Sequence, residues 1–251
     1  MPNPSDVRRV KGTVRHTLDQ LMLVDLLRYV VVAARYIWFT KVQKRLATLR
    51  RGEGADEAVA EHTVSHNLKG LRDLAVNRSH LLVRPLSVIE SLHTGSRILS
   101  IGPRSEGELL SLAAHGFDWS RIEGLDLISY SPKVKLGDMH RTPYADGTFD
   151  AVMLGWVIAY SEEPTVAARE IARITRPGGI VAVGVEYNPL SQEEIVAAAG
   201  YNPGARKRIE SCDEILSYFG DAVDHVYYRH TVAPADRARL GNFCVLFSVK
   251  R

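Results

Sequence analysis

The chain has 251 residues, of which 24% are charged and 45% are hydrophobic, and its formal net charge is +3. This is the size and composition of a soluble globular protein with one sizeable domain and an extension, or with two small domains. The excess of positive charge is too small to indicate a nucleic-acid-binding protein by itself. The two cysteines, Cys212 and Cys244, have no metal-type spacing, so we expect no disulfide framework, no bound metal and a reducing, cytoplasmic setting.

The first 17 residues are mostly polar and do not have the pattern of a secretory signal. Residues 18–49 lack glycine and proline and are predicted to form one long helix. Asp25, Arg28 and Arg35 interrupt its apolar content along one narrow stripe. Charges at the centre of a membrane-spanning helix cost about 2.5–3.5 kcal/mol each, so we do not expect this helix to cross a bilayer.

Two uses of this helix remain open. It can pack on its own domain or on a second copy in a homodimer. It can also lie on a membrane surface, because several cations follow its apolar part. These cations are Lys41, Lys44, Arg45, Arg50 and Arg51.

Residues 52–56 form a break with the composition of a linker, and residues 56–93 are predicted to be helical in pieces, with interruptions at Asn77 and Pro85. The histidines of this stretch match no metal-binding motif. They are His62, His66 and His80. We therefore divide the chain into an N-terminal helical extension, residues 1–93, and a second domain, residues 94–251.

The second domain opens with a short apolar strand over residues 98–101. Gly102 and the two residues after it form a tight turn, and Ser105 begins a helix with Glu108 three positions later, which is the pattern of a capping box. A strand that leads through a tight turn into the start of a helix is the place where α/β proteins bind ligands.

The next strand, residues 122–127, places Asp126 at its carboxyl end, 24 positions after Gly102. An acid about 20 positions after such a turn binds ribose hydroxyls in dinucleotide-binding proteins, although a plain turn cap is the alternative. Only seven residues separate Asp126 from the following strand at Val134. This connection is too short for the helix of an ordinary parallel crossover, so we expect a loop there.

Residues 137–185 contain the clearest pattern in the chain. A turn leads into a buried strand over residues 149–154, a helix begins near Pro164, and Arg173 and Arg176 are expected in its last turn. Pro177-Gly178-Gly179 is expected to end that helix before a strand over residues 180–185. Strand, helix and strand at this spacing predict an α/β fold with a parallel sheet.

Three motifs in this region resemble those of class I S-adenosylmethionine-dependent methyltransferases of the type 11 small-molecule group. They are Asp138 before a turn, the box Pro143-Tyr144-Ala145-Asp146-Gly147-Thr148-Phe149-Asp150, and Pro177-Gly178-Gly179. The resemblance covers residues 97–187 and extends more loosely to the C-terminus. It implies a Rossmann-like, mostly parallel seven-stranded sheet with a C-terminal antiparallel hairpin, built here from residues 222–231 and 243–249.

The same resemblance implies S-adenosyl-L-methionine as the cofactor, methyl transfer to a small-molecule or glycan acceptor, and a lid formed by residues 56–93. It places Asp138 at the exocyclic amine of the adenine and Met139 against the ring. Trp156 would form a wall of the cofactor or substrate pocket, with a place in the core as the alternative.

The glycine loop departs from the family pattern, because Ser100 replaces its acid and Arg104 its middle glycine. Four residues are expected to hold the cofactor. Gly102, Arg104 and Glu106 belong to this loop, and Asp126 follows the next strand. Arg104 would clamp the cofactor's carboxylate and Glu106 would face its cationic end, unless the two side chains pair with each other. A pyrophosphate would meet Glu106 and Glu108, which disfavours a dinucleotide-dependent enzyme.

A base for the acceptor's proton is also required if that proton is not lost easily. Many relatives carry Glu-His where this chain has Ala159-Tyr160. The position of His140 and Glu186 makes them the predicted catalytic residues, with Tyr160 a further candidate. A methyltransferase-fold protein that has lost catalysis and serves as a binding or assembly subunit remains the alternative function.

Overall fold

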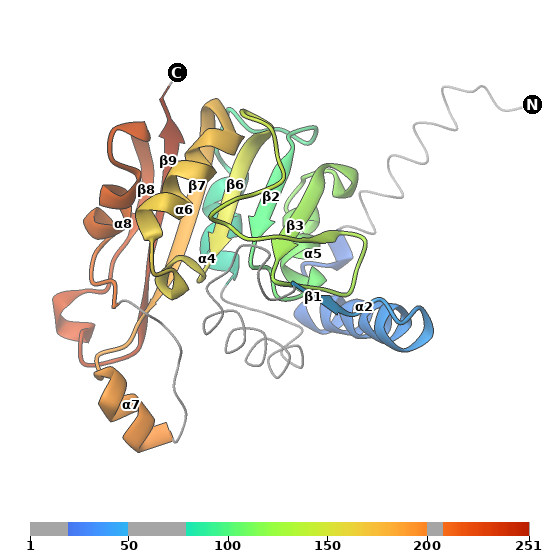
Figure 1. Cartoon of the computed structure of the whole chain (residues 1–251), viewed down its shortest axis with the longest axis horizontal. Coiled ribbons are helices and arrows are strands. Elements are labelled where there is room, and N and C mark those ends of the chain that lie inside the picture. The colour runs from blue at the N-terminus through green and yellow to red at the C-terminus, as the bar shows by residue number, and fades with distance from the viewer. Residues whose placement is uncertain (1–19, 50–78, 200–207, 251) are drawn as a thin grey trace, which may run out of the picture.

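The computed structural model describes residues 20–49, 79–199 and 208–250. These residues form one twisted sheet with helices on both of its faces, and an N-terminal helix at one side (Figure 1). The strand order is β5-β3-β2-β6-β7-β9-β8. Strands β5, β3, β2, β6 and β7 are parallel, whereas β9 is antiparallel to both β7 and β8. The predicted Rossmann-like methyltransferase sheet with a C-terminal antiparallel hairpin is confirmed.

The strands of this sheet are β2 (Ile98–Ile101), β3 (Ile122–Asp126), β5 (Val134–Leu136), β6 (Phe149–Gly155), β7 (Thr175–Tyr187), β8 (Val223–His230) and β9 (Gly241–Val249). The α-helices are α2 (Asp25–Ile37), α4 (His80–Ser87), α5 (Glu106–Ala114), α6 (Pro164–Ile174), α7 (Gln192–Ala199) and α8 (Cys212–Phe219). A separate two-stranded ribbon pairs β1 (Ala47–Thr48) with β4 (Ile128–Ser129).

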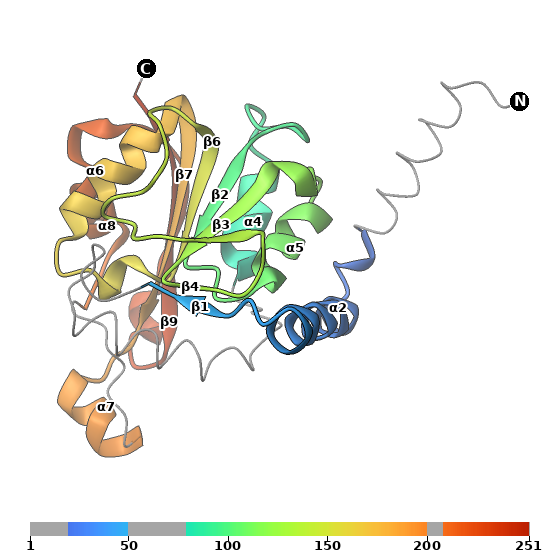
Figure 2. The ribbon, with the colours of Figure 1, turned by 45° about the vertical axis from the view of Figure 1, so that its right-hand side comes forward.

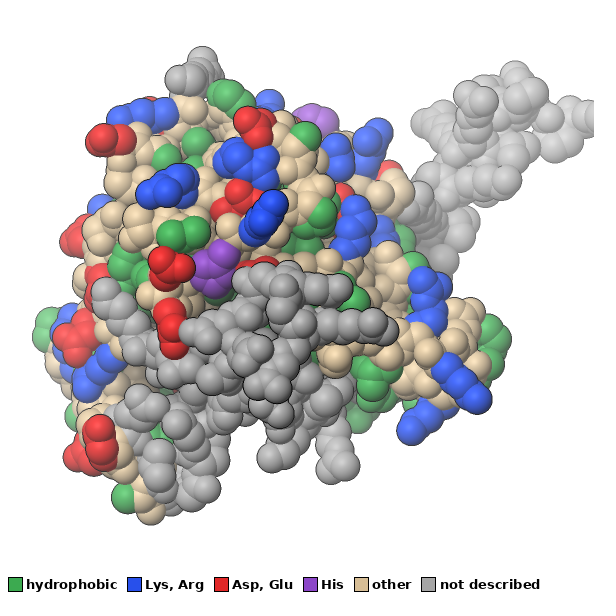
Figure 3. Space-filling model, viewed as in Figure 1, with side chains coloured by type: hydrophobic (Ala, Val, Ile, Leu, Met, Phe, Trp, Pro, Cys, Tyr) green, Lys and Arg blue, Asp and Glu red, His purple; other side chains and the backbone are tan. Residues whose placement is uncertain are grey.

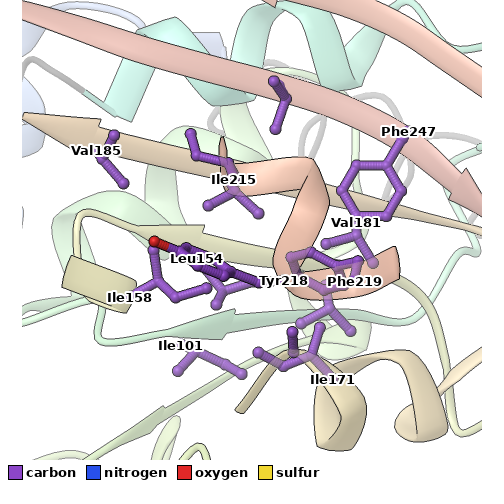
Figure 4. Close-up of a cluster of buried hydrophobic side chains, with 14 of the residues drawn as sticks. Ile101, Leu154, Ile158, Ile171, Val181, Val185, Ile215, Tyr218, Phe219 and Phe247 are labelled. Atoms are coloured by element: carbon purple, nitrogen blue, oxygen red, sulfur yellow. The ribbon is translucent and has the colours of Figure 1, made fainter. Parts of the chain in front are cut away.

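Strand periodicity divides the core into two layers. Successive side chains of a strand point to opposite faces, so Val152 and Leu154 of β6 join one cluster while Ala151 and Met153 join the other. The first cluster lies under α6 and α8, where Phe219 packs edge-on against Phe247 (Figure 4). The second lies under α4 and α5. Because both faces are covered, the central strands are apolar throughout.

The predicted helix over residues 18–49 is shorter in the structure. Helix α2 continues as one π-helical segment, Trp38–Val42, and ends where Lys44 adopts a left-handed backbone conformation with φ of 52°. Ala47 and Thr48 then pair with β4 instead of continuing the helix. Residues 18 and 19 lie outside the described residues. No described helix is long and apolar enough to cross a bilayer.

Three local predictions are corrected by the structure. Pro85 lies inside α4 and does not interrupt it, because the helix continues past it to Ser87. Helix α6 ends at Ile174, so Arg173 is in its last turn but Arg176 lies in β7, together with the Pro-Gly-Gly motif. Ser105 caps α5 by accepting a hydrogen bond from the Gly107 N–H at 3.2 Å, but Glu108 does not complete the box, because its carboxylate is turned into the protein.

The connection from β3 to β5 has no helix, as its length predicted, and contains only the two residues of β4 and a turn. The predicted boundary between residues 93 and 94 stays a prediction. Helix α4, just before it, contributes Leu82, Val83 and Leu86 to the second core layer. Asn77, His62, His66 and most of the predicted lid, residues 56–78, lie outside the described residues.

Candidate active site

The candidate site is built on the turns that follow the parallel strands at the carboxyl edge of the sheet. After β2, both Gly102 and Arg104 have left-handed backbones, with φ of 68° and 53°. The Gly102 N–H donates to the Leu125 carbonyl at 2.8 Å, which ties the turn to β3. A side chain at position 102 would overlap Val157, so the turn requires glycine for two independent reasons.

Asp126 joins this turn to the end of β3. Its Oδ2 accepts a hydrogen bond from the Arg104 N–H at 3.1 Å, and its Oδ1 accepts one from the Ile128 N–H at 3.3 Å. Burial raises the pKa of the Asp126 carboxyl to about 6, against the opposing effect of these backbone hydrogen bonds. The Arg104 side chain is half-buried and makes no hydrogen bond or ion pair with any described residue. Gly102, Arg104 and Asp126 are therefore brought together as one group.

Glu106 has partners that the sequence did not indicate. Its fully buried carboxylate forms a bidentate ion pair with Arg35 of α2, in which Arg35 Nη2 donates to Oε1 at 2.9 Å and Nε donates to Oε2. Ser131 also donates to Oε1, and the Glu106 N–H donates to the Tyr130 hydroxyl at 3.0 Å. The hydrogen bond with Glu106 raises the pKa of Arg35. Neither a free Glu106 carboxylate nor a pair with Arg104 is present, and a role of Glu106 in cofactor binding stays a prediction.

A second buried carboxylate lies beside the serine that replaces the acid of the glycine loop. The Ser100 hydroxyl, on β2, donates to Oε1 of Glu108, and the Ser79 hydroxyl donates to Oε2 at 2.7 Å. Residue 100 thus has a carboxylate beside it, but the carboxylate comes from α5 and not from the strand. Gly155 leaves room for it, since a side chain there would meet Oε2 at 2.9 Å.

His140 lies between two polar partners. Asp138 Oδ1 lies 2.6 Å from its Nδ1, and the Ser161 hydroxyl lies 2.6 Å from its Nε2. The Asp138 carboxylate can only accept, so we assign the proton of the neutral ring to Nδ1, which leaves Nε2 to accept from Ser161. Asp138 and Ser161 are buried, whereas the His140 side chain is 27% exposed. The three residues form a continuous hydrogen-bonded relay.

The remaining predicted residues lie in different surroundings. Met139 is half-buried and packs on the first core cluster. Trp156 is 4% exposed, belongs to the second core cluster and donates from Nε1 to Asn242 Oδ1 at 2.8 Å. These contacts agree with the alternative of a place in the core, and a role in a pocket wall stays a prediction. Glu186 is exposed on β7, opposite Asn242 of β9. Tyr160 ends a single turn of 3-10 helix after β6.

The sequence analysis did not identify Ser161, Arg35 or Val157. Ser161 follows β6 at the same edge of the sheet as His140, a position that strand order could have indicated once the sheet was assumed. Arg35 was taken as part of a helix stripe, and no pattern in the sequence relates it to a residue 71 positions away. Among the described residues, no group of three or more histidine, cysteine or acidic side chains could hold a metal ion.

Comparison with known families now adds to this geometry. Residues 105–183 match the family model of a methyltransferase domain, over the stretch that carries α5, β6 and α6. Residues 105–183 therefore match a methyltransferase domain, and the sheet around them has the class I fold. The predicted family resemblance is confirmed.

Solved structures support the same fold. A putative methyltransferase of Haloferax volcanii, solved in complex with the Trm112 methyltransferase activator, has a TM-score of 0.56 at 20% identity, covering 79% of this chain and all of that one. Geranyl diphosphate C-methyltransferase from Streptomyces coelicolor has a TM-score of 0.52 at 15% identity, covering 81% of this chain and 90% of that one. At such identities the likeness concerns the fold alone.

Curated relatives of the methyltransferase domain include demethylmenaquinone methyltransferases. The protein from Parafrankia sp. is 45% identical over 91 residues, which are 35% of this chain and 36% of the relative. That from Mycobacterium tuberculosis is 30% identical over 112 residues, 41% of this chain and 47% of the relative. The chain therefore spans less than half the length of these curated relatives.

Proposed function

We propose that this protein transfers a methyl group from S-adenosyl-L-methionine to a small-molecule acceptor. The observation that carries the proposal is the bond between Asp126 and the Arg104 backbone, which joins the turn after β2 to the acid after β3. In a Rossmann-like sheet this is the position at which a nucleoside is held.

The residues of the site fit this cofactor in three places. Asp126 accepts backbone hydrogen bonds from Arg104 at Oδ2 and from Ile128 at Oδ1, and its carboxylate has further acceptor capacity for a ribose hydroxyl. The Arg104 guanidinium can clamp the carboxylate of the methionine part. Asp138 Oδ2 makes no hydrogen bond with a described residue and can accept from an exocyclic amine. The Glu106 carboxylate is engaged by Arg35, and its predicted place at the cationic end of the cofactor stays a prediction.

When bound, the cofactor supplies an electrophilic methyl group on a sulfonium. The chain's own part in such an in-line displacement is to align the acceptor, to exclude water and to remove a proton if the acceptor requires it. In our proposal Ser161 takes the acceptor's proton while its own hydroxyl proton moves to His140 Nε2. The Asp138 carboxylate then stabilises the imidazolium through Nδ1–H. Glu186 stays the second predicted base.

The acceptor class follows from the relatives only as a proposal. The curated relatives named above carry the name of demethylmenaquinone methyltransferases, so an apolar quinol is the first acceptor to test. A glycan acceptor stays a prediction without support from these relatives.

The deciding experiment is calorimetric titration of the purified protein with S-adenosyl-L-methionine, with NAD as the control ligand. We expect binding of the methyl donor alone, and weaker binding by the Arg104→Ala and Asp126→Ala variants. Methyl transfer to a quinol is then measured with isotope-labelled donor. Donor binding without transfer to any acceptor would favour the alternative of a binding or assembly protein. Absence of donor binding would overturn the proposal.

A further inference from the structure

The outer face of the N-terminal helix is an apolar surface without a partner in the described structure. Helix α2 and its π-helical end lie at one side of the molecule, apart from α6 and α8 (Figures 1 and 2). Its large apolar side chains are 40–70% exposed. We define the α2 outer face by these residues: Val24, Leu26, Leu27, Tyr29, Val30, Ile37, Trp38 and Val42.

The inner face of the same helix carries its charges. Arg28 is 1% exposed, donates to the Met22 carbonyl at 2.7 Å and pairs with Asp25 at 2.5 Å. Arg35 pairs with the buried Glu106. Val32 packs on Leu110 of α5. The two arginines that interrupt the apolar sequence are therefore turned toward the domain, and Asp25, whose side chain is 51% exposed, is paired with Arg28.

Cations follow the apolar surface directly. Lys41, Lys44 and Arg45 are exposed at the end of the helix. Between residues 20 and 49 the only acid in the sequence is Asp25, which is paired with Arg28. Figure 3 shows hydrophobic and basic side chains together over the α2 region of the face in view. A surface that is apolar and positive, with no free acid in this segment, is complementary to anionic headgroups above acyl chains.

A second copy of the chain matches this surface less well. A two-fold dimer through the α2 outer face would bring both sets of cations to one interface without acids of this helix to neutralise them. An anionic bilayer neutralises the cations and buries the apolar side chains at the same time.

We propose that the α2 outer face binds the surface of an anionic lipid bilayer, with the helix lying in the interface plane. The ion pair of Arg35 with Glu106 fixes this helix to α5, so binding would hold the whole methyltransferase domain at the membrane. The proposal does not depend on methyl transfer. Of the candidate active site it uses only Glu106, and only as the partner that fixes Arg35.

The test is flotation of the full chain with vesicles of phosphatidylglycerol and phosphatidylcholine, compared with phosphatidylcholine alone. We expect binding to the anionic vesicles and a loss of about fivefold in partition for each of Lys41 and Lys44 changed to Gln. Trp38 provides a direct probe, since it is 52% exposed and belongs to the face. Its emission should shift to shorter wavelength with anionic vesicles, and the Trp38→Phe variant should lose the shift.

A matched pair of variants separates this face from general apolar exposure. Leu26 is 70% exposed on the α2 outer face, and Leu240, between η6 (Pro234–Asp236) and β9, is 68% exposed. Leu26→Glu should lower vesicle partition at least about tenfold, whereas Leu240→Glu should leave it unchanged. Wild-type protein that stays with the unbound fraction at low salt would overturn the proposal. A dimer in light scattering that Leu26→Glu dissociates, without vesicle binding, would assign the face to a second copy and overturn it as well.

Discussion

Arg35 on α2 and Glu106 in the first turn of α5 form a bidentate ion pair between residues 71 positions apart. The carboxylate is fully buried and the guanidinium is about one-third exposed, at 35%. The pair connects the N-terminal helix to the helix that follows the candidate cofactor turn. The free energy of this ion pair therefore stabilises the packing of the N-terminal helix on the rest of the domain.

Removal of the cation from this pair should destabilise the protein. In Arg35→Ala the Glu106 carboxylate would stay buried without its counter-ion, and we expect a loss of about 2–3 kcal/mol, since the exposure of Arg35 moderates the cost. Urea unfolding followed by circular dichroism measures this loss. Arg35→Ala combined with Glu106→Gln should recover part of it. A double variant that is as unstable as the sum of both single variants would contradict the coupling.

The turn at Gly102 should not accept any larger residue. Gly102→Ala combines a left-handed backbone, which costs a residue with a Cβ about 1–2 kcal/mol, with overlap against Val157. We expect a lower melting temperature and weaker donor binding. Val157→Ala in the same chain should relieve the overlap but not the backbone strain, so the double variant should be intermediate. Equal stability of Gly102→Ala and wild type would show that the turn differs from the one described.

Asp126 should make folding stability fall as pH rises through the acid range. The folded-state pKa of about 6 lies above the ordinary value of 3.8, so the native state retains a proton that the unfolded chain has lost. As pH rises from about 4 to 6, this titration should lower the free energy of unfolding by about 3 kcal/mol. Denaturant titrations across that range measure the slope. Asp126→Asn should flatten it, and an unchanged slope in that variant would assign the effect to other groups.

The same titration should appear in donor binding. A charged Asp126 accepts hydrogen bonds from ribose hydroxyls better than a protonated one. We therefore expect affinity for S-adenosyl-L-methionine to rise with pH up to about 6 and then to level off, as measured by calorimetry. Asp126→Asn should bind weakly with no such rise.

Within the relay of Asp138, His140 and Ser161, changes at His140 and Ser161 should affect turnover more than donor binding. His140→Ala removes the proposed proton acceptor, and we expect kcat to fall about 10²–10⁴-fold with donor affinity kept. Ser161→Ala should lower kcat as well, and Asp138→Asn should lower it by removing the negative charge that faces Nδ1. Glu186→Gln serves as the comparison, because it tests the second predicted base. Loss of activity in Glu186→Gln alone would assign the base to β7.

The sequence by itself determined the order of strands and helices in the sheet, and it predicted the edge at which the candidate site lies. Apolar runs over residues 98–101, 149–154 and 180–185 predicted the parallel strands, because buried strands need apolar side chains on both faces. The short link after Asp126 correctly predicted a crossover without a helix. The carboxyl-edge rule then indicated Gly102 and Asp126 as members of one edge.

Only the tertiary structure decided which side chains face one another. Glu106 was expected to face a ligand or Arg104, and its carboxylate pairs with Arg35. For Trp156 both a pocket wall and the core were open, and its indole lies in the second core cluster. Glu108 was expected to cap α5 and instead accepts from Ser79 and Ser100. The reason is physical: periodicity reports which face of an element is apolar, whereas the partner of a buried charge depends on how distant elements pack.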